Sequence, residues 1–376
     1  MKEQMSEKKN AAWTIAFLGM ILLFLTAADL LTPERTYSEN ENRILAKKPE
    51  LTVEGVRDGS FMKDFGEYVR DQFVGRDKWV MLKTQGDILL QKKEINGVYL
   101  CKDDYLIEQH LPQDIDENTV KKKINLLKRL NTEYGAKAML VPTADNILTE
   151  KLPAYVQYYD ETKLLAQVKE SLGEKNVIDV TDALKEHEDE EIYYRTDHHW
   201  TSLGAYYGYQ AWKEQTGKLA PVLLEPEQLT KVSDSFLGTL YSKLNVPWKA
   251  DAIECFPEEL LRTVSVTYDF NRRTDSLYES GYLEEKNKYG YFLDDNHPFI
   301  EIETGYQNGR SLFLIKDSYA NCMIPMLSLH YEKIYVVDLR YYNGRLVNLM
   351  DGYVTEATDV LVLYDCIHFI ENFVYY

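Results

Sequence analysis

Hydrophobic and polar positions along the chain fall into two alternating patterns. Short apolar runs that end in polar residues are typical of buried parallel strands. Such runs lie in 136–146, 176–184, 310–344 and 359–369. Apolar residues at helical spacing lie in 61–93, 114–134 and 160–172, and a further helix is expected to begin near Ser202. Strands that alternate with helices predict an α/β fold, with a mostly parallel sheet and helices on both of its faces.

Other segments lack this alternation. Residues 216–305 contain short strand-like pieces, many Tyr and charged residues and little periodicity, which predicts an irregular, strand-rich insertion. Apolar runs on either side of a polar turn predict a hairpin at 95–108. Residues 32–60 are polar and irregular, as is typical of a linker. We therefore expect one domain over 61–376 that contains the insertion, preceded by the linker and by a separate segment, 1–31.

The N-terminal segment is strongly apolar. Residues 11–28 are uncharged and mostly hydrophobic, with Lys2, Lys8 and Lys9 before them and Asp29 after them. This length is near the lower limit for a membrane-spanning helix, and the preceding positive charge predicts an N-terminus inside the cell. The alternative is a signal peptide that is cleaved, giving a secreted chain. Both alternatives export residues 32–376, so we expect the remainder of the chain outside the membrane.

The overall charge is acidic, with 43 Lys and Arg against 61 Asp and Glu and a net charge of −18. Nucleic acids bind through cationic contacts to phosphate, so no nucleic-acid partner is expected. The four Cys form no C-x-x-C pair, which argues against a structural zinc site, and we predict no cofactor. Whether any of them form disulfides is left open. The 29 Tyr suit stacking on sugars, although many could equally be edge-strand or surface residues.

One short motif concentrates residues that could do chemistry. In "EIYYRTDHHWTSLGAYYGYQAW", residues 191–212, Asp197, His198, His199 and Trp200 are adjacent. At i and i+2 of an extended segment, the side chains of Asp197 and His199 project to the same side, so the carboxylate could orient the imidazole. A metal site and a simple surface loop are the alternatives. Adjacent His side chains tend to point apart, which disfavours the metal site.

A candidate nucleophile lies about 120 residues later. Ser318 follows the apolar run "LFLI" and precedes "YANCMIPML", which is typical of a strand-to-helix turn. Backbone N–H groups at the start of a helix can stabilise an oxyanion beside such a hydroxyl. A serine needs an adjacent base, and Asp197 with His199 could supply one. The alternative is that Ser318 only caps a helix.

Other polar residues follow the predicted strands, where ligands bind in sheets of this kind. They are Asn146, Asp317, Arg340, Tyr341, Tyr342, Asn343 and Asp365. Tyr341 and Tyr342 are candidates for stacking on a sugar, and Asn146 and His198 for contacts with substrate.

The motif at 196–212 resembles the signature of a known family. "TDHHWTSLGAYYGYQAW" resembles the signature of the DHHW proteins, which are similar to the alginate O-acetylation proteins, a circularly permuted branch of the SGNH-hydrolase superfamily. The segments 65–79, 96–108 and 141–146 and the downstream "LIKDSYAN" also resemble family segments. The resemblance implies an SGNH-hydrolase-like parallel sheet in permuted order, with the Asp and His ahead of the Ser.

The resemblance also implies roles for individual residues. It assigns Ser318, His199 and Asp197 to a catalytic triad. The block that is Gly-Asp-Ser in ordinary relatives is Lys316-Asp317-Ser318 here, so it is degenerate. Arg340–Gly344 would occupy the block whose backbone N–H assists the oxyanion hole. The Asn of the last block is missing, with Asp365 or Cys366 near its place.

Together with these features, the resemblance implies an exported, membrane-anchored O-acyltransferase, with acetyl as the expected acyl group and a cell-surface polysaccharide as the acceptor. The resemblance implies a membrane-bound O-acyltransferase partner that delivers acyl groups across the bilayer. One alternative is a carbohydrate acetyl-esterase with the same triad and water as the acceptor. Another is a non-catalytic scaffold of a surface polysaccharide assembly complex, which the degenerate serine block keeps open.

Overall fold

We analysed a computed structural model of the chain, which describes all residues except 1, 39–42, 218–221 and 375–376. The chain forms two compact units. The first comprises Met1–Gln91 with Leu244–Val246, and the second comprises Lys92–Lys243 with Pro247–Tyr376. The predicted domain boundary at residue 61 therefore differs from the one observed, because 61–91 belong to the N-terminal unit.

The N-terminal unit is mainly helical. Its elements are α1 (Lys2–Leu31), β1 (Tyr37–Ser38), β2 (Arg43–Ile44), α2 (Val53–Asp58), α3 (Ser60–Gln72) and α4 (Arg76–Leu89). Residues Asn10–Leu31 of α1 are long and apolar enough to cross a membrane, although a signal sequence would pass the same test. The helix predicted over 61–93 is interrupted between α3 and α4, where Gly75 has a φ of +65° that favours glycine.

The predicted linker, 32–60, is not an unstructured tether in its described part, which leaves out 39–42. Its backbone is tied to α3: the Ala46 N–H donates to Asp71 at 2.8 Å, and the Gln72 side chain bonds the backbone of Arg35 in both directions at 2.9 Å. These contacts explain why the segment belongs to the same compact unit as the helices.

The second unit is built around one seven-stranded sheet with the order β10-β9-β11-β13-β12-β14-β6. Four neighbouring strands are parallel: β13 (Lys333–Asp338), β12 (Ser311–Lys316), β14 (Thr358–Asp365) and β6 (Lys137–Val141). The other three are antiparallel: β11 (Phe299–Thr304), β9 (Val264–Tyr268) and β10 (Arg272–Thr274). The sheet is therefore mixed, and the predicted parallel sheet accounts for four of its strands.

The antiparallel strands correct the prediction of an insertion at 216–305. β9, β10 and β11 come from that segment and extend the main sheet. β9 alternates between buried and half-exposed residues, which is the pattern of a strand that covers the core on one face only, whereas β11 begins with two buried residues, Phe299 and Ile300, that enter the cores on opposite faces. The same segment also supplies α10 (Thr239–Leu244) and a separate hairpin of β7 (Thr230–Phe236) and β8 (Asp251–Cys255).

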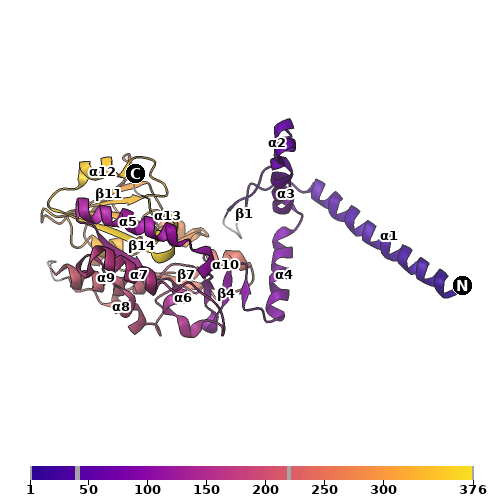
Figure 1. The fold of residues 1–376 in the computed structure, drawn as a ribbon, viewed down its shortest axis with the longest axis horizontal. Helices are drawn as coiled ribbons and strands as arrows, with labels where there is room; N and C mark the ends of the chain where they lie inside the picture. Colours follow the sequence, from indigo (N-terminus) through magenta and orange to yellow (C-terminus); the bar gives the residue numbers. More distant parts are fainter. Residues whose placement is uncertain (1, 39–42, 218–221, 375–376) are drawn as a thin grey trace. The chain divides into compact units, whose positions relative to one another are not determined.

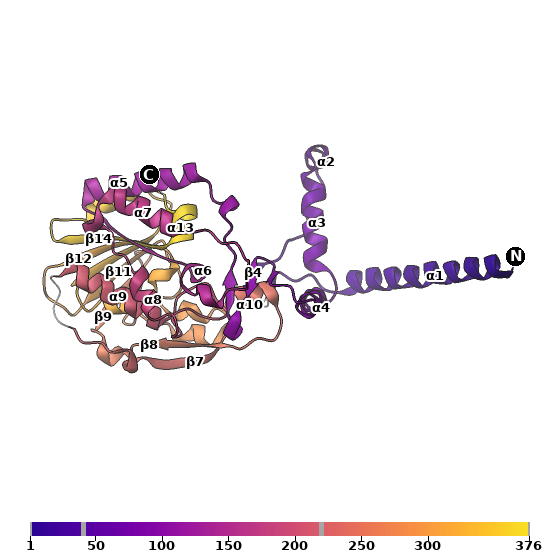
Figure 2. The same ribbon diagram turned by 60° about the horizontal axis from the view of Figure 1, so that its bottom comes forward.

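Helices cover both faces of the sheet (Figures 1 and 2). Alternate residues of the central strand β12 enter two different core clusters, Leu312 and Leu314 in one and Phe313 and Ile315 in the other. The first core includes residues of α6 (Ala144–Ile147), α8 (Thr181–Glu186), α9 (Ser202–Thr216) and α11 (Ile324–Leu327). The second includes residues of α5 (Glu117–Tyr134), α7 (Thr162–Leu172), α12 (Leu346–Tyr353) and α13 (Cys366–Asn372).

Two local predictions are modified by the structure. The hairpin predicted at 95–108 is a three-stranded sheet of β3 (Glu94–Ile95), β4 (Val98–Leu100) and β5 (Leu106–Glu108). The short strand predicted at 176–184 makes a single bridge, Val177 to Ala138, and the helical turn predicted after it is α8, which begins at Thr181. The Asp179 carboxylate accepts the Thr181 N–H at 2.9 Å, and this local side-chain bond favours a helix start over a longer strand. All four Cys are free thiols.

Candidate active site

The structure brings Asp197, His199 and Ser318 into one hydrogen-bonded line. Nδ1 of His199 lies 2.5 Å from an oxygen of Asp197, and its Nε2 lies 2.8 Å from Oγ of Ser318. All three residues are buried. The imidazole thus joins the carboxylate and the hydroxyl, which are more than a hundred residues apart in sequence. This arrangement can transfer a proton from the hydroxyl to the imidazole.

A tight turn holds the Asp-x-His segment. Tyr193 bridges Trp200 across the turn, and the Tyr194 N–H donates to the His199 carbonyl at 3.2 Å. The carboxylate of Asp251 anchors the turn from outside, because it accepts the backbone N–H groups of Arg195 and Thr196, each at 2.8 Å. The predicted i, i+2 contact therefore forms in a hydrogen-bonded turn.

Ser318 lies directly beyond the end of β12, as predicted, but no long helix follows it. Residues Ser318–Ala320 form one 3₁₀ turn, and α11 begins only at Ile324. The Tyr319 N–H donates to the carboxylate of Asp317 at 2.9 Å, so this amide is already engaged. The helix-start N–H groups that the sequence suggested for an oxyanion are thus partly used by Asp317.

Asp197 is held by residues that the sequence did not single out. Oxygen Oδ2 of Asp197 accepts the N–H of Thr239 at 2.8 Å and its hydroxyl at 3.0 Å. Although burial opposes ionisation, the two neighbouring His side chains and the Thr239 N–H outweigh it, so the pKa of Asp197 lies well below its usual range. Asp197 is therefore a carboxylate, as an orienting partner for an imidazole must be.

Because Gly238 has no side chain, the side chain of Asp197 can lie close to the backbone at residue 238. A Cβ placed on Gly238 would lie 2.3 Å from both Cβ and Oδ2 of Asp197. Gly238 and Thr239 lie in the segment that lacks periodicity, so no local pattern marks them.

Tyr289 contacts two members of the line from another side. Its ring stacks on the His199 imidazole, with the centroids 3.9 Å apart and an interplanar angle of 13°. Its hydroxyl donates to the Ser318 carbonyl at 3.0 Å. Trp200, the last residue of the motif, donates from Nε1 to the Tyr319 carbonyl at 2.7 Å and so ties the His199 and Ser318 turns together. No signal in the sequence separates Tyr289 from the other 28 Tyr.

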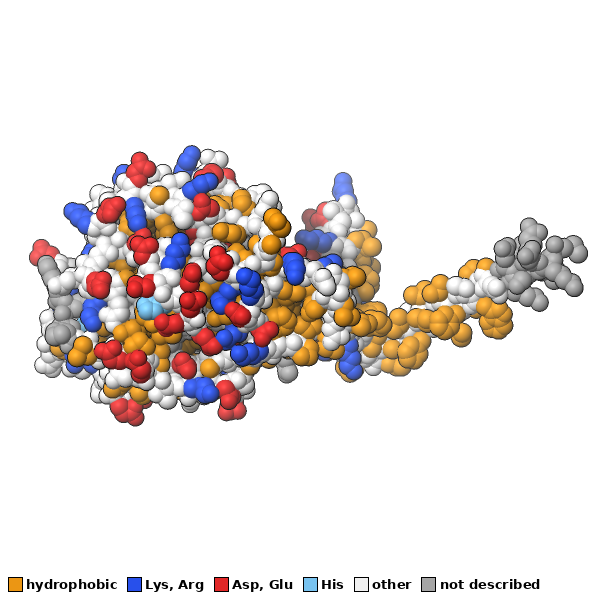
Figure 3. Space-filling view, turned by 90° about the horizontal axis from the view of Figure 1, so that it is seen from below, with side chains coloured by type: hydrophobic (Ala, Val, Ile, Leu, Met, Phe, Trp, Pro, Cys, Tyr) orange, Lys and Arg blue, Asp and Glu red, His pale blue; other side chains and the backbone are white. Residues whose placement is uncertain are grey.

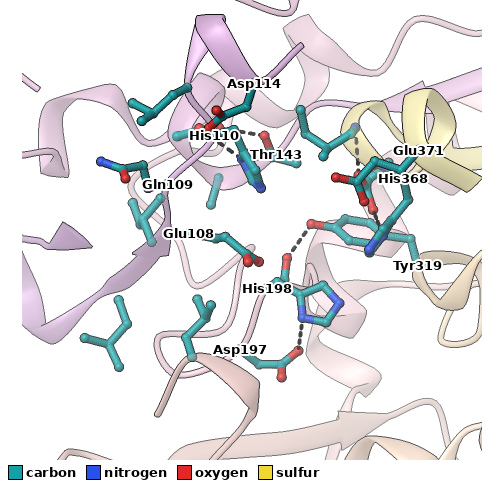
Figure 4. Close-up of a pocket in the computed structure, with 18 of the residues that line it drawn as sticks. Glu108, Gln109, His110, Asp114, Thr143, Asp197, His198, Tyr319, His368 and Glu371 are labelled. Carbon is teal, nitrogen blue, oxygen red and sulfur yellow. Dashed lines mark hydrogen bonds and ion pairs between the residues drawn. The ribbon is translucent and has the colours of Figure 1, made fainter. Parts of the chain in front are cut away.

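His198 lines a neighbouring pocket (Figure 4), and its ring centroid lies 3.9 Å from that of His199, so the two imidazoles do not point apart as expected. Its Nδ1 lies 2.8 Å from the Thr239 hydroxyl. Burial, together with the adjacent His199, lowers the pKa of His198 to about 4, so the ring is neutral at physiological pH. The pocket has a volume of about 220 Å³, and its polar lining includes Glu108, Asp145 and His368. His198 is therefore a pocket residue, and its role as a substrate contact stays a prediction.

Two further carboxylate–imidazole pairs border this pocket. The attraction of Asp365 raises the pKa of His368 to about 11, with Oδ2 of Asp365 hydrogen-bonded to Nδ1. Burial alone would lower the pKa of His110, but its 3.2 Å contact with Asp145 outweighs that effect and raises the pKa to about 9. Both imidazoles are thus cationic at neutral pH.

The remaining predicted residues lie apart from the triad line. The Arg340 guanidinium bonds Asp338 at 2.9 and 2.6 Å, and its backbone N–H also donates to Asp338, at 3.1 Å. Tyr341 is exposed, and Tyr342 is half-buried beside a surface pocket near Gly344. The amide of Asn146 bonds Asp145 and the backbone of residues 159 and 161, which is a structural role. Among the described residues, no contact joins these four side chains to Ser318.

Lys316 replaces the Gly of the serine block, and the structure gives it partners. Its fully buried Nζ lies 2.8 Å from Oδ1 of Asn321, 3.1 Å from Oδ1 of Asn296 and 3.4 Å from Oδ2 of Asp338. A buried cation is tolerated when it is paired and hydrogen-bonded in this way. Lys316 thus braces the residues around the Ser318 turn.

In the described part of the chain, two residue groups have donor atoms close enough together to hold a cation: Asp197 with His198 and His199, and Asp317 with Asp365 and His368. The first group already bonds Ser318 and Thr239. In the second, the carboxylate oxygens accept backbone N–H groups, for example from Tyr319 and His368. These oxygens serve local structure, and we derive no metal chemistry from either group.

Comparison with solved structures gives the same fold. A DHHW family protein from Eubacterium siraeum is 24% identical, covers 75% of this chain and 97% of its own, and superposes with a TM-score of 0.60. Bacillus cereus PatB1 with a sulfonyl adduct is 21% identical, covers 73% of this chain and 97% of its own, with a TM-score of 0.60. Among curated proteins, none matches this sequence. The DHHW protein family profile matches residues 96–337, well over half of the chain. The chain therefore belongs to the DHHW protein family.

Proposed function

We propose that this protein is an exported, membrane-anchored O-acyltransferase that transfers acyl groups, most simply acetyl groups, to a cell-surface polysaccharide. The observation that carries the proposal is the hydrogen-bonded line of Asp197, His199 and Ser318. A serine in such a line is activated as a nucleophile. The apolar helix Asn10–Leu31 would anchor the chain, with the remainder outside the membrane.

The reaction takes two steps. The Ser318 hydroxyl gives its proton to Nε2 of His199 as its oxygen attacks the acyl carbonyl, and the imidazolium then protonates the departing alcohol or thiol of the donor. An acyl ester on Ser318 remains. A sugar hydroxyl next gives its proton to His199 and attacks this ester, and Ser318 recovers the proton as it leaves. Asp197 holds the imidazole in position and stabilises its cation in both steps.

The order of the strands supports a permuted SGNH-like arrangement. Asp197 and His199 precede the serine strand β12, which lies inside the parallel part of the sheet between β13 and β14. This proposal assigns no second oxyanion donor, since three N–H groups of the block Arg340–Gly344 that the resemblance implied, those of Arg340, Tyr341 and Tyr342, are bonded to Asp338.

The pocket beside His198 is the proposed place for the acceptor sugar. It combines apolar residues such as Leu240 and Ile367 with carboxylates and imidazoles, which suits a hydroxylated ligand. The resemblance to the alginate O-acetylation proteins supports a membrane-bound O-acyltransferase as the partner that supplies the acyl group. We propose no cofactor, because the triad chemistry needs none.

The proposal can be tested with the full chain in detergent and a sulfonyl fluoride, which sulfonylates an activated serine and releases fluoride. We expect the mass gain on Ser318, its loss in Ser318→Ala, and strong slowing in His199→Ala. Ser280→Ala, at an exposed serine, should behave like wild type. A chain that stays unmodified under all conditions, or that is modified equally in His199→Ala, would refute the triad and favour the scaffold alternative.

Acyl transfer and ester hydrolysis differ in their acceptor. After loading the enzyme with a chromogenic acetyl ester, we expect addition of oligosaccharide to speed release of acetyl from Ser318 and to yield an acetylated sugar. Free acetate alone, at a rate that does not depend on the sugar, would make the protein an esterase.

A further inference from the structure

The N-terminal unit carries an apolar surface on its helix α4. Trp79, Leu82, Leu89 and Leu90 are 51%, 58%, 83% and 75% exposed. At about 100° per residue, these four positions fall within an arc of about 100° around the helix axis. A helix that packs on a core of its own would turn such an arc inward. Figure 3 shows hydrophobic side chains over much of the visible face of this unit, both on α1 and beside it.

Polar residues take the buried positions of the same helix. Thr84 and Asp87 are buried in α4, and Asp71 is buried at the end of α3. Lys78 and Lys83 are exposed and lie on either side of the apolar arc. An apolar stripe flanked by lysines is the pattern of a helix that lies in a membrane interface, where the lysines reach the lipid phosphates.

This surface begins next to the end of the proposed membrane span. The Val74 N–H, just before α4, donates to the carboxylate of Asp29 in the last turns of α1 at 3.0 Å. The Tyr68 hydroxyl donates to Glu34 at 2.6 Å. Trp79 follows Val74 by five residues, little more than one helical turn. Trp is enriched at the level where membrane-spanning helices leave the hydrocarbon.

The charge of the unit allows contact with an anionic surface. Residues 32–91 contain ten Lys and Arg against eleven Asp and Glu, and residues 1–31 are balanced, whereas the whole chain carries −18. Nearly all of the net negative charge therefore resides in the catalytic unit. Anionic lipids would repel that unit, but not the one that bears α4.

We propose that the apolar face of α4, formed by Trp79, Leu82, Leu89 and Leu90, lies in the lipid interface on the outer side of the membrane. The occupant of this face is the lipid headgroup and acyl boundary, and α4 acts as a second attachment beside the span. The inference rests on the proposed anchoring by α1, and it is independent of whether the protein transfers acyl groups.

The test measures Trp fluorescence of the full chain in nanodiscs of anionic lipid brominated near the headgroup. In a Trp13→Phe background, we expect quenching relative to nonbrominated lipid, and its loss when Trp79 is also changed to Phe. Leu82→Glu with Leu89→Glu should reduce the quenching. Gln85→Glu adds one negative charge, as each of these two changes does, but it lies outside the arc and should leave the quenching unchanged.

The outcomes separate the anchor from the inference. Trp13 is read in a Trp79→Phe chain and reports on α1, so quenching of Trp13 without quenching of Trp79 keeps the anchor and overturns lipid contact by α4. A protein partner would then cover the face. Quenching of Trp79 alone would show lipid contact by α4 without the span, which overturns its role as a second attachment, and quenching of neither overturns both proposals.

Discussion

A single methyl group at Gly238 tests whether the position of Asp197 matters. In Gly238→Ala, the added Cβ would lie 2.3 Å from Cβ and Oδ2 of Asp197 and 2.7 Å from its Cγ, whereas ordinary contacts begin at 3.4 Å. The obstructing atoms include Cβ, which cannot swing away, so Asp197 must shift by about 1 Å, a displacement that can cost about 100-fold in rate. We expect sulfonylation of Ser318 to slow by that order in a chain that remains folded.

Two controls make the result specific. Gly352→Ala adds a methyl group where nothing lies within 4 Å, and it should leave the rate unchanged. In an Asp197→Gly background, the three obstructing atoms are gone, so Gly238→Ala should no longer lower the thermal unfolding midpoint. Wild-type reactivity in a folded Gly238→Ala chain would show that the triad does not depend on this placement of Asp197.

Two further changes probe the surroundings of the site. Tyr289→Leu removes the ring stacked on His199, and loss of a cation–π contact of about 0.5–2 kcal/mol should slow acylation about 2- to 30-fold. Tyr289→Phe keeps the ring and should lose less in kcat/KM; equal losses would assign the effect to the hydroxyl. Burial, with Asp145 nearby, raises the pKa of Glu161 to about 8, so the folded chain keeps a proton that the unfolded chain releases above about pH 4.5. Glu161→Gln should therefore gain stability over wild type as pH rises from about 5 to about 8, measured by urea unfolding, and a constant difference would contradict this.

The proton on Glu161 also follows from geometry. The Thr143 hydroxyl lies 2.7 Å from Oε1 of Glu161 and 2.6 Å from Oδ1 of Asp145. One hydroxyl hydrogen cannot serve two ionised carboxylates, so one of the pair must carry a proton. The raised pKa assigns it to Glu161.

The sequence predicted the parts of the fold that have a strong local pattern. The runs that became β6, β12, β13 and β14 are apolar on both faces, so their burial was readable. β9 and β11 carry polar residues between their apolar ones, and only the pairing of β11 with β13, and of β9 with β11, places them in the sheet. Pairing between distant strands is a tertiary property that no local window contains.

The same limit applies to the site. The sequence placed three candidate residues at turns that follow predicted elements: Asp197, His199 and Ser318. Their mutual contact was predicted from residue type and from the family resemblance. Thr239 and Tyr289 come from a segment without periodicity, and their residue types are common. Thr239 matters because it contacts Asp197, and Tyr289 because it contacts His199. These contacts exist only in the folded chain.

Three carboxylate–imidazole pairs lie in or beside the same pocket, and the structure distinguishes their roles. With pKa values raised to about 9 and about 11, His110 and His368 carry a proton at neutral pH and cannot accept another. Nε2 of His199 lies 2.8 Å from the Ser318 hydroxyl, so a proton lost by Ser318 has an acceptor already aligned. The two cationic imidazoles offset part of the negative charge of the pocket's carboxylates, which would otherwise oppose an oxyanion forming nearby. We therefore propose His199 as the base and propose electrostatic compensation for the other two imidazoles.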